Sequence, residues 1–200
     1  MEGGPIEVFD PHFHIWDIRK PEGYADPTTL FAPAGTDHEG LYNAADLERD
    51  WESLPDGFVH TGGVFVEAIS CCFKHKNAQE LAPLCLKEAE WVQTELDKSP
   101  GKKEYYLVPT ACLEDPDVGA VLAKLAQNPK VKGIRQTLNV APDWPRTGDN
   151  GLGELLDNSQ VRAARTLASP SQISSQSTET ALLRTVGGWL RVAGRCWVLV

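Results

Sequence analysis

The hydrophobic pattern of the first 140 residues alternates between strand-like and helix-like stretches. Near-continuous or alternating apolar runs of strand length cover residues 6–17, 60–69, 104–113 and 131–138. Apolar residues recur at helical spacing over residues 44–54, 77–98 and 115–128. Strands that alternate with helices favour parallel pairing through right-handed crossovers. The pattern therefore predicts an α/β fold with about four strand–helix units.

The predicted helices each carry one apolar stripe, which indicates the face that packs on the sheet. Asn43 is placed to cap the first of them. The stripe residues, which we expect in the core, are Leu47, Trp51 and Leu54, then Leu81, Leu84, Cys85, Ala89, Val92 and Leu96, then Val118, Val121, Leu122 and Leu125.

The alternating pattern stops near residue 160. Residues 151–158 predict one more helix, residues 169–177 are a polar low-complexity run, and residues 180–192 have helical spacing weakened by two glycines. Net charge also changes sign, from −13 over residues 1–160 to +4 over residues 161–200. We therefore divide the chain into 1–160 and an atypical Ser- and Arg-rich tail, 161–200. Our hypothesis is that an altered reading frame, alternative splicing or a faulty gene model produced this tail.

Two histidines mark the end of the first predicted strand. On an extended chain, residues two apart project to the same face, so the imidazoles of His12 and His14 can converge. Pro11 lacks an N–H donor, which interrupts ladder pairing and places the pair at the mouth of the strand. Imidazole nitrogens bind zinc at about 2.0–2.1 Å, so the pair is a candidate metal site. The alternative is a solvated turn that binds nothing.

Two charged residues end other predicted strands. Glu67 follows the second strand, where a carboxylate can orient a ligand, bind substrate or simply cap the next loop. Arg135 lies late in the fourth strand between apolar neighbours, and its planar guanidinium suits a two-point contact with a substrate carboxylate. A surface salt bridge is the alternative for Arg135.

Four stretches carry a resemblance to a known family, namely the D-x-H-x-H-x-W string over 10–16, the strand over 63–68, the Gly-Ile-Arg string over 133–135 and Trp144-Pro145-Arg146. They resemble the amidohydrolase-related family, which includes 2-pyrone-4,6-dicarboxylate lactonase and L-fuconolactonase. The resemblance implies a metal-dependent hydrolase with a TIM-type (β/α)8 barrel, of which this chain holds about four units. It also implies a divalent metal such as zinc, or none, at His12 and His14, and a small-molecule substrate, a lactone, cyclic ester or amide, held by Arg135, Glu67 and Arg146.

The resemblance covers residues 4–160 and leaves parts of the family's machinery unaccounted for. Metal-dependent relatives use a further histidine from a middle strand and an aspartate from the last strand as general base. No histidine follows His75, and the late aspartates Asp143, Asp149 and Asp157 precede the tail. We therefore expect this chain to be inactive as a truncated hydrolase. The alternative is a non-catalytic half-barrel that associates with another chain through an open sheet edge.

Composition and charge argue against two classes of partner, nucleic acids and membranes. The net charge of −9 argues against nucleic acid, because such binding relies on clustered basic residues. No apolar run approaches the roughly 20 residues of a membrane span, and no signal peptide is evident, so we expect a cytoplasmic protein that binds no membrane. Five cysteines without C-x-x-C spacing favour reduced thiols.

Overall fold

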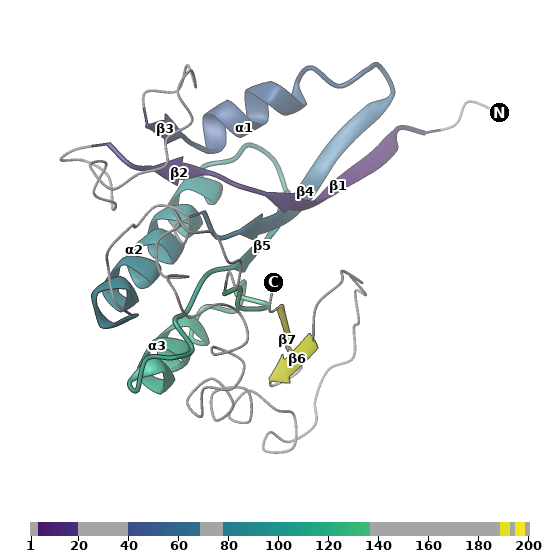
Figure 1. The fold of residues 1–200 in the computed structure, drawn as a ribbon. Coiled ribbons are helices and arrows are strands. Elements are labelled where there is room, and N and C mark those ends of the chain that lie inside the picture. The colour runs from purple at the N-terminus through teal and green to yellow at the C-terminus, as the bar shows by residue number, and fades with distance from the viewer. Residues whose placement is uncertain (1–3, 20–39, 69–77, 137–188, 193–194, 199–200) are drawn as a thin grey trace, which may run out of the picture.

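The computed structural model describes residues 4–19, 40–68, 78–136, 189–192 and 195–198 (Figure 1). The elements in chain order are β1 (Ile6–Phe13), β2 (Trp16–Asp17), β3 (Leu41–Tyr42), α1 (Ala44–Trp51), β4 (Phe58–Val66), α2 (Ala78–Leu96), β5 (Glu104–Val108), α3 (Val118–Leu125), β6 (Trp189–Val192) and β7 (Arg195–Val198). The predicted α/β class is confirmed by a parallel sheet of order β1-β4-β5. The predicted (β/α)8 barrel stays a prediction, because three parallel strands are common to many α/β folds.

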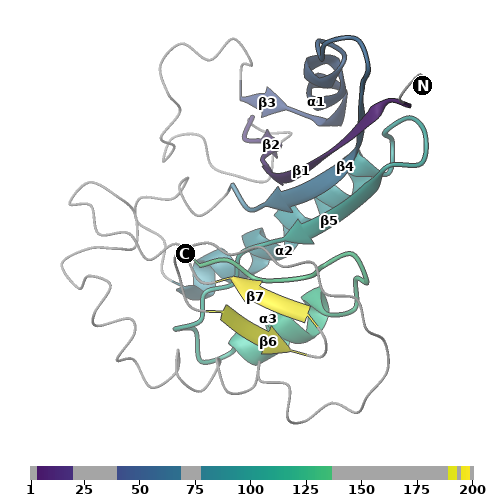
Figure 2. The ribbon, with the colours of Figure 1, turned by 90° about the vertical axis from the view of Figure 1, so that its right-hand side faces the viewer.

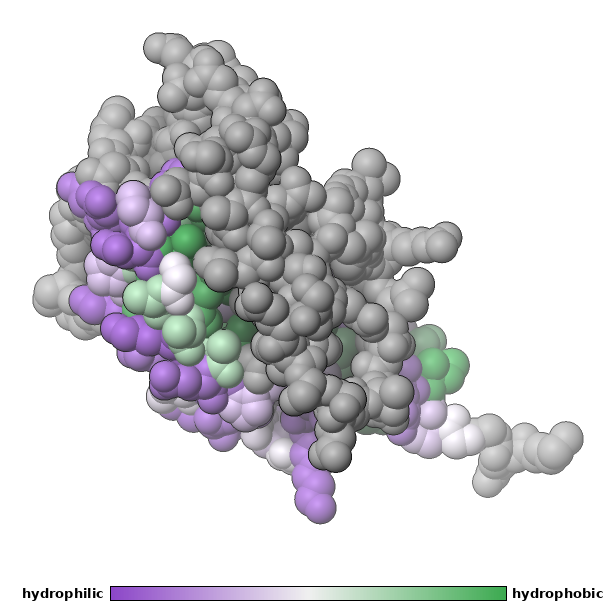
Figure 3. All heavy atoms as spheres, turned by 90° about the horizontal axis from the view of Figure 1, so that it is seen from below, coloured by the Kyte–Doolittle hydropathy of each residue, from purple (hydrophilic) through white to green (hydrophobic). Residues whose placement is uncertain are grey.

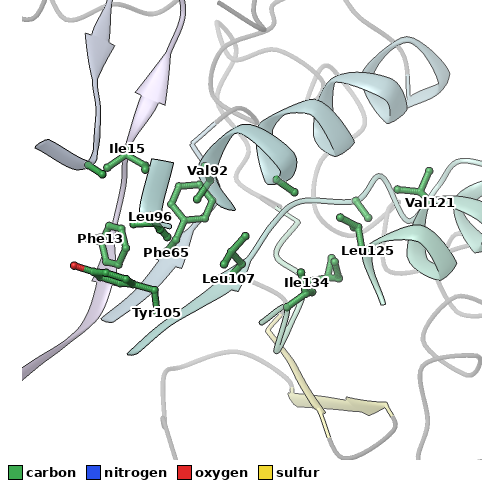
Figure 4. Close-up of a cluster of buried hydrophobic side chains, with 14 of the residues drawn as sticks. Phe13, Ile15, Phe65, Val92, Leu96, Tyr105, Leu107, Val121, Leu125 and Ile134 are labelled. Atoms are coloured by element: carbon green, nitrogen blue, oxygen red, sulfur yellow. The ribbon is translucent and has the colours of Figure 1, made fainter. Parts of the chain in front are cut away.

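The parallel sheet and α2 enclose the hydrophobic core. Phe13 pairs with Phe65, and Phe65 pairs with Leu107, so one row of large side chains crosses all three strands. Figure 4 shows these side chains meeting Val92 and Leu96 of α2, which Figure 2 shows behind the sheet. Phe65 and Leu107 have no exposed surface. The helical stripe predicted for α2 is thus the stripe that the core buries.

The predicted helices form, with shifted ends. Asn43 caps α1 as predicted, because its side chain accepts hydrogen bonds from the N–H groups of Ala45 and Asp46. The helix predicted from residue 115 begins only at Val118. Asp115 instead makes a turn, in which its carboxylate accepts the N–H of Asp117 at 3.0 Å. Such local side-chain bonds compete with the helical ones.

The fourth predicted strand is wrong as a regular strand over the part that the structure describes. Residues 131–136 run parallel to the β5 segment but make only two isolated bridges, Leu107 with Val131 and Thr110 with Arg135. Pro109 lies between the two partner positions and has no N–H to donate. Its carbonyl still accepts the Arg135 N–H at 3.0 Å, so the chain direction is kept although the ladder is broken.

The end of the helix predicted over 180–192 is also wrong. Residues 189–192 form β6, which pairs antiparallel with β7. Both segments are rich in Trp and Val, which favour strands. Their four paired positions form a ladder, whereas a short helix leaves many of its terminal N–H and C=O groups without an intrahelical partner. Residues 151–158 and 169–177, for which a helix and a low-complexity run were predicted, lie outside the described residues.

The described surface has both polar and apolar regions. Seen from below, it is largely hydrophilic, and apolar atoms reach it in a few places (Figure 3). The large apolar residues that are exposed lie on β1 and β4, namely Ile6, Phe9, Phe58 and Val59. No helix among the described segments has the length and apolar character that a membrane span needs. The thiols of Cys85 and Cys112 are buried.

A buried histidine joins β4 to α1. The His60 ring is 7% exposed and stacks on Trp51, with ring centroids 4.2 Å apart and planes 10° apart. Burial is the main cause that lowers the pKa of His60 below its usual value, and the Lys103 ammonium adds to it. The carboxylates of Glu48 and Asp10 oppose this shift.

We expect His60 to make the fold sensitive to acid. Its pKa is lower in the folded than in the unfolded chain, so the unfolded chain takes up the proton first as pH falls below about 6.5. The free energy of unfolding should therefore fall with decreasing pH, by at most about 1.4 kcal/mol per pH unit from this group. Urea unfolding between pH 7.5 and 5.5 measures the slope.

The matched variant is His60→Phe, which keeps a flat ring on Trp51 and removes the titrating group. Its unfolding free energy should depend less on pH than that of the parent chain. Equal slopes in the two proteins would contradict a role for His60.

Candidate functional site

Four of the five predicted site residues lie at one edge of the sheet. His12 is near the end of β1 and His14 follows that strand, while Glu67 directly follows β4. Arg135 bridges to Thr110, two residues beyond β5. Because the strands are parallel, their carboxyl ends share this edge, where α/β folds commonly place ligands. Arg146 lies outside the described residues.

The two imidazoles converge, as the spacing predicted. Their Nε2 atoms are 3.1 Å apart, and their planes are inclined by 69°. The Nδ1 of His14 lies 2.8 Å from the carbonyl oxygen of Val66, which can only accept, so Nδ1 is the donor and the neutral ring presents the lone pair of Nε2 to His12. Two imidazoles on a tetrahedral zinc would hold their nitrogens about 3.3 Å apart. The pair therefore fits a shared metal ion.

The pairing of β1 with β4 is irregular where β1 carries the first histidine. The β1–β4 register shifts between Asp10 and Phe13, across Pro11. The carboxylate of Asp10 accepts the backbone N–H of His12 at 2.9 Å, which supplies the partner that the interrupted ladder lacks. Asp10 and Pro11 thus shape the turn that presents the histidines.

The surroundings of His12 favour its neutral form. Burial lowers the pKa of His12, and the nearby His14 ring and Arg135 guanidinium lower it further, whereas Asp10 raises it. A histidine must be neutral to bind a metal through nitrogen. His12 is thus ready to act as a ligand at neutral pH.

Arg135 is held at the site by Glu67. The Glu67 side chain has no exposed surface, and its Oε1 lies 3.6 Å from Nη1 of Arg135. The same Nη1 is 3.5 Å from the Glu67 backbone oxygen. The Arg135 side chain is 17% exposed, and its Nε is buried without a hydrogen-bond partner among the described residues. Glu67 therefore positions Arg135, and its own buried carboxylate is not exposed for direct contact with a ligand.

Glu88 supports this arrangement and was not among the predicted site residues. It is fully buried on α2, and its Oε1 accepts the N–H of Ala68 at 3.0 Å, one residue beyond Glu67. The sequence does contain a signal, because Glu88 falls on the apolar stripe between Cys85 and Val92. An acidic residue at a core position needs a partner, and here the partner is the backbone next to the site.

Within the part of the chain that the structure describes, His12 and His14 are the metal ligands that we propose. Among the residues that the structure describes, no group of three or more His, Cys, Asp or Glu side chains is arranged to hold a metal ion. Catalytic zinc sites commonly have three protein ligands. His12 and His14 would supply two of them.

No protein-family model, curated protein or solved structure matches this chain significantly. The resemblance to the amidohydrolase-related family therefore remains a prediction carried by the quoted motifs.

Proposed function

We propose that this chain carries the first part of a hydrolytic site of the amidohydrolase-related type, acting on a lactone, cyclic ester or amide of a small organic acid. The observation that carries the proposal is the 3.1 Å approach of the His12 and His14 Nε2 atoms. It occurs at the carboxyl edge of parallel strands, and the cationic Arg135 is near enough to lower the pKa of His12.

The fold is compatible with the start of a (β/α)8 barrel. In chain order, α1 joins β1 to β4, α2 joins β4 to β5, and α3 follows β5, which is the alternation that such barrels repeat. We propose that these elements are the first units of that barrel. The antiparallel pair β2–β3 lies within the first crossover.

Each residue of the site has a proposed task. His12 and His14 would hold a divalent metal such as zinc, which when bound would polarise the scissile carbonyl and favour attack by water. Arg135 would bind the anionic group of the substrate and orient it. Glu67 keeps Arg135 in place, and Glu88 holds the backbone N–H of Ala68 next to Glu67. A third ligand and a general base are also required for this chemistry.

The proposal is tested by assaying the purified chain, with added zinc, against a panel of lactones and cyclic amides. Because the sequence alone leads us to expect an inactive chain, hydrolysis above background would show that other residues of this chain complete the site. That hydrolysis should be lost in His12→Ala and persist in Lys132→Ala, whose ammonium lies over the Tyr106 ring. Rates for the parent chain that equal those of His12→Ala would reject the proposal.

Substrate charge gives a second readout. Arg135→Leu should raise KM for a lactone that carries a carboxylate and leave KM for its methyl ester unchanged, because only the first can pair with a guanidinium. An equal effect on both substrates would remove Arg135 from the proposed role.

A second candidate is a non-catalytic half-barrel that associates with another chain. It is favoured by the position of β1 at the edge of the described sheet and by the exposure of Ile6, which is 57%. Such an edge can pair with a further strand. Size-exclusion chromatography over a concentration series tests this candidate, and a monomer at every concentration would count against it.

A further inference from the structure

A hollow beside the histidine pair lies between β1 and α1 and is not needed for the proposed reaction. Its volume is about 430 Å³, within the roughly 300–1,000 Å³ of small-molecule sites. It is lined by apolar, aromatic and acidic residues, namely Asp10, Phe13, His14, Trp16, Tyr42, Leu47, Asp50, Trp51 and Leu54. The hollow is therefore large enough for an organic molecule.

Three partly exposed aromatic rings form much of its wall, and other rings hold them in place. Trp16 stacks on Tyr42 across the β2–β3 pair, with centroids 5.0 Å apart and planes 22° apart. Trp51 stacks on the buried His60 ring at 4.2 Å. Rings fixed in this way cost little further conformational entropy when a ligand binds.

Two carboxylates line the hollow, and the Arg49 guanidinium is close enough to Tyr42 to lower the pKa of that phenol. The carboxylates are those of Asp10 and Asp50, and no lysine or arginine is among the lining residues that the structure describes. The hydroxyl of Tyr42 donates to the Oδ2 of Asp50, which ties that carboxylate to the aromatic wall. Burial and this bond outweigh Arg49 and raise the pKa of Tyr42, so the phenol stays neutral and keeps donating to the Asp50 carboxylate.

We propose that this hollow binds an organic cation of the alkylammonium class. Aromatic faces attract such cations through their quadrupoles, and the carboxylates of Asp10 and Asp50 complement the charge. A hard metal ion is disfavoured, because it would require several oxygen ligands where the wall offers mainly rings. The binding does not depend on hydrolysis, although His14 borders the hollow and would bring the cation next to the histidine pair.

The test compares choline with its neutral carbon analogue, 3,3-dimethylbutan-1-ol, which has nearly the same shape. Titration calorimetry on the full chain, with tryptophan fluorescence as a second signal, gives both affinities. Choline is expected to bind about tenfold more tightly, because only choline offers a charge to the rings and carboxylates. Equal affinities, or no binding of choline, would overturn the proposal.

Variants locate the binding. Asp50→Asn and Trp16→Leu should each weaken choline binding about fivefold or more, while Asp56→Asn, an exposed residue outside the hollow, should not. His12→Ala should bind choline normally even if it abolishes hydrolysis, so the two proposals fail separately. Urea unfolding confirms that each variant is folded, and unchanged affinity in a folded Asp50→Asn would contradict the inference.

Discussion

Replacing Gly62 by alanine is expected to lower the free energy of unfolding by about 4 kcal/mol, enough to unfold a typical domain of marginal stability. Gly62 has a φ of +144°, which side chains of L-residues rarely adopt, and an added Cβ would lie 1.9 Å from the carbonyl oxygen of Glu104. That oxygen belongs to the backbone of β5, so relief requires the β4–β5 pair to separate. Urea or thermal unfolding measures the loss.

The control is Gly57→Ala. Gly57 also has a positive φ, of +90°, but nothing lies within 4 Å of the added Cβ. Only the backbone strain remains, which is expected to cost about 1 kcal/mol. If both variants lose the same stability, the contact between Gly62 and β5 is not what requires glycine.

Replacing His14 by alanine is expected to weaken zinc binding at least about 100-fold and to abolish any hydrolysis by the chain. Loss of an outer partner alone costs metal sites up to about 100-fold, and His14 is proposed as a direct ligand. The variant also removes the bond that fixes the pair to the Val66 carbonyl. Competition with a coloured zinc chelator gives the affinity, and the lactone assay gives the activity.

His60→Phe is the matched histidine deletion, because His60 lies in the core against Trp51 and outside the pair. It should keep the affinity for zinc. A zinc affinity that survives in His14→Ala would place the ion elsewhere, and a surviving rate of hydrolysis would remove the pair from the reaction.

Much of the candidate site follows from the positions of residues relative to strand ends. His12, His14, Glu67 and Arg135 were each predicted at the end of a strand, and parallel pairing brings strand ends together. The prediction held for Arg135 even though its strand is broken, since the Thr110 bridge keeps its place in the sheet.

Other features of the site depend on packing that spacing does not encode. Glu88 reaches the site because α2 lies against the end of β4, a contact between residues 20 positions apart. The hollow requires β1, β3 and α1 to meet, and no local pattern states where Tyr42 and Trp51 lie relative to Asp10. The positions of these side chains therefore depend on how helices and strands pack against one another.

The sequence alone determined the alternation of the three parallel strands with three helices, the apolar stripes of those helices and the same-side placement of His12 and His14, because backbone periodicity and local bonding decide them. Tertiary structure decided which side chains and backbone groups of these elements contact one another. It left residues 131–136 without a regular ladder beside Pro109, paired Glu67 with Arg135 and opened a hollow beside β1. The physical reason is that burial and charge depend on distances between segments far apart in the chain, which only the packed fold defines.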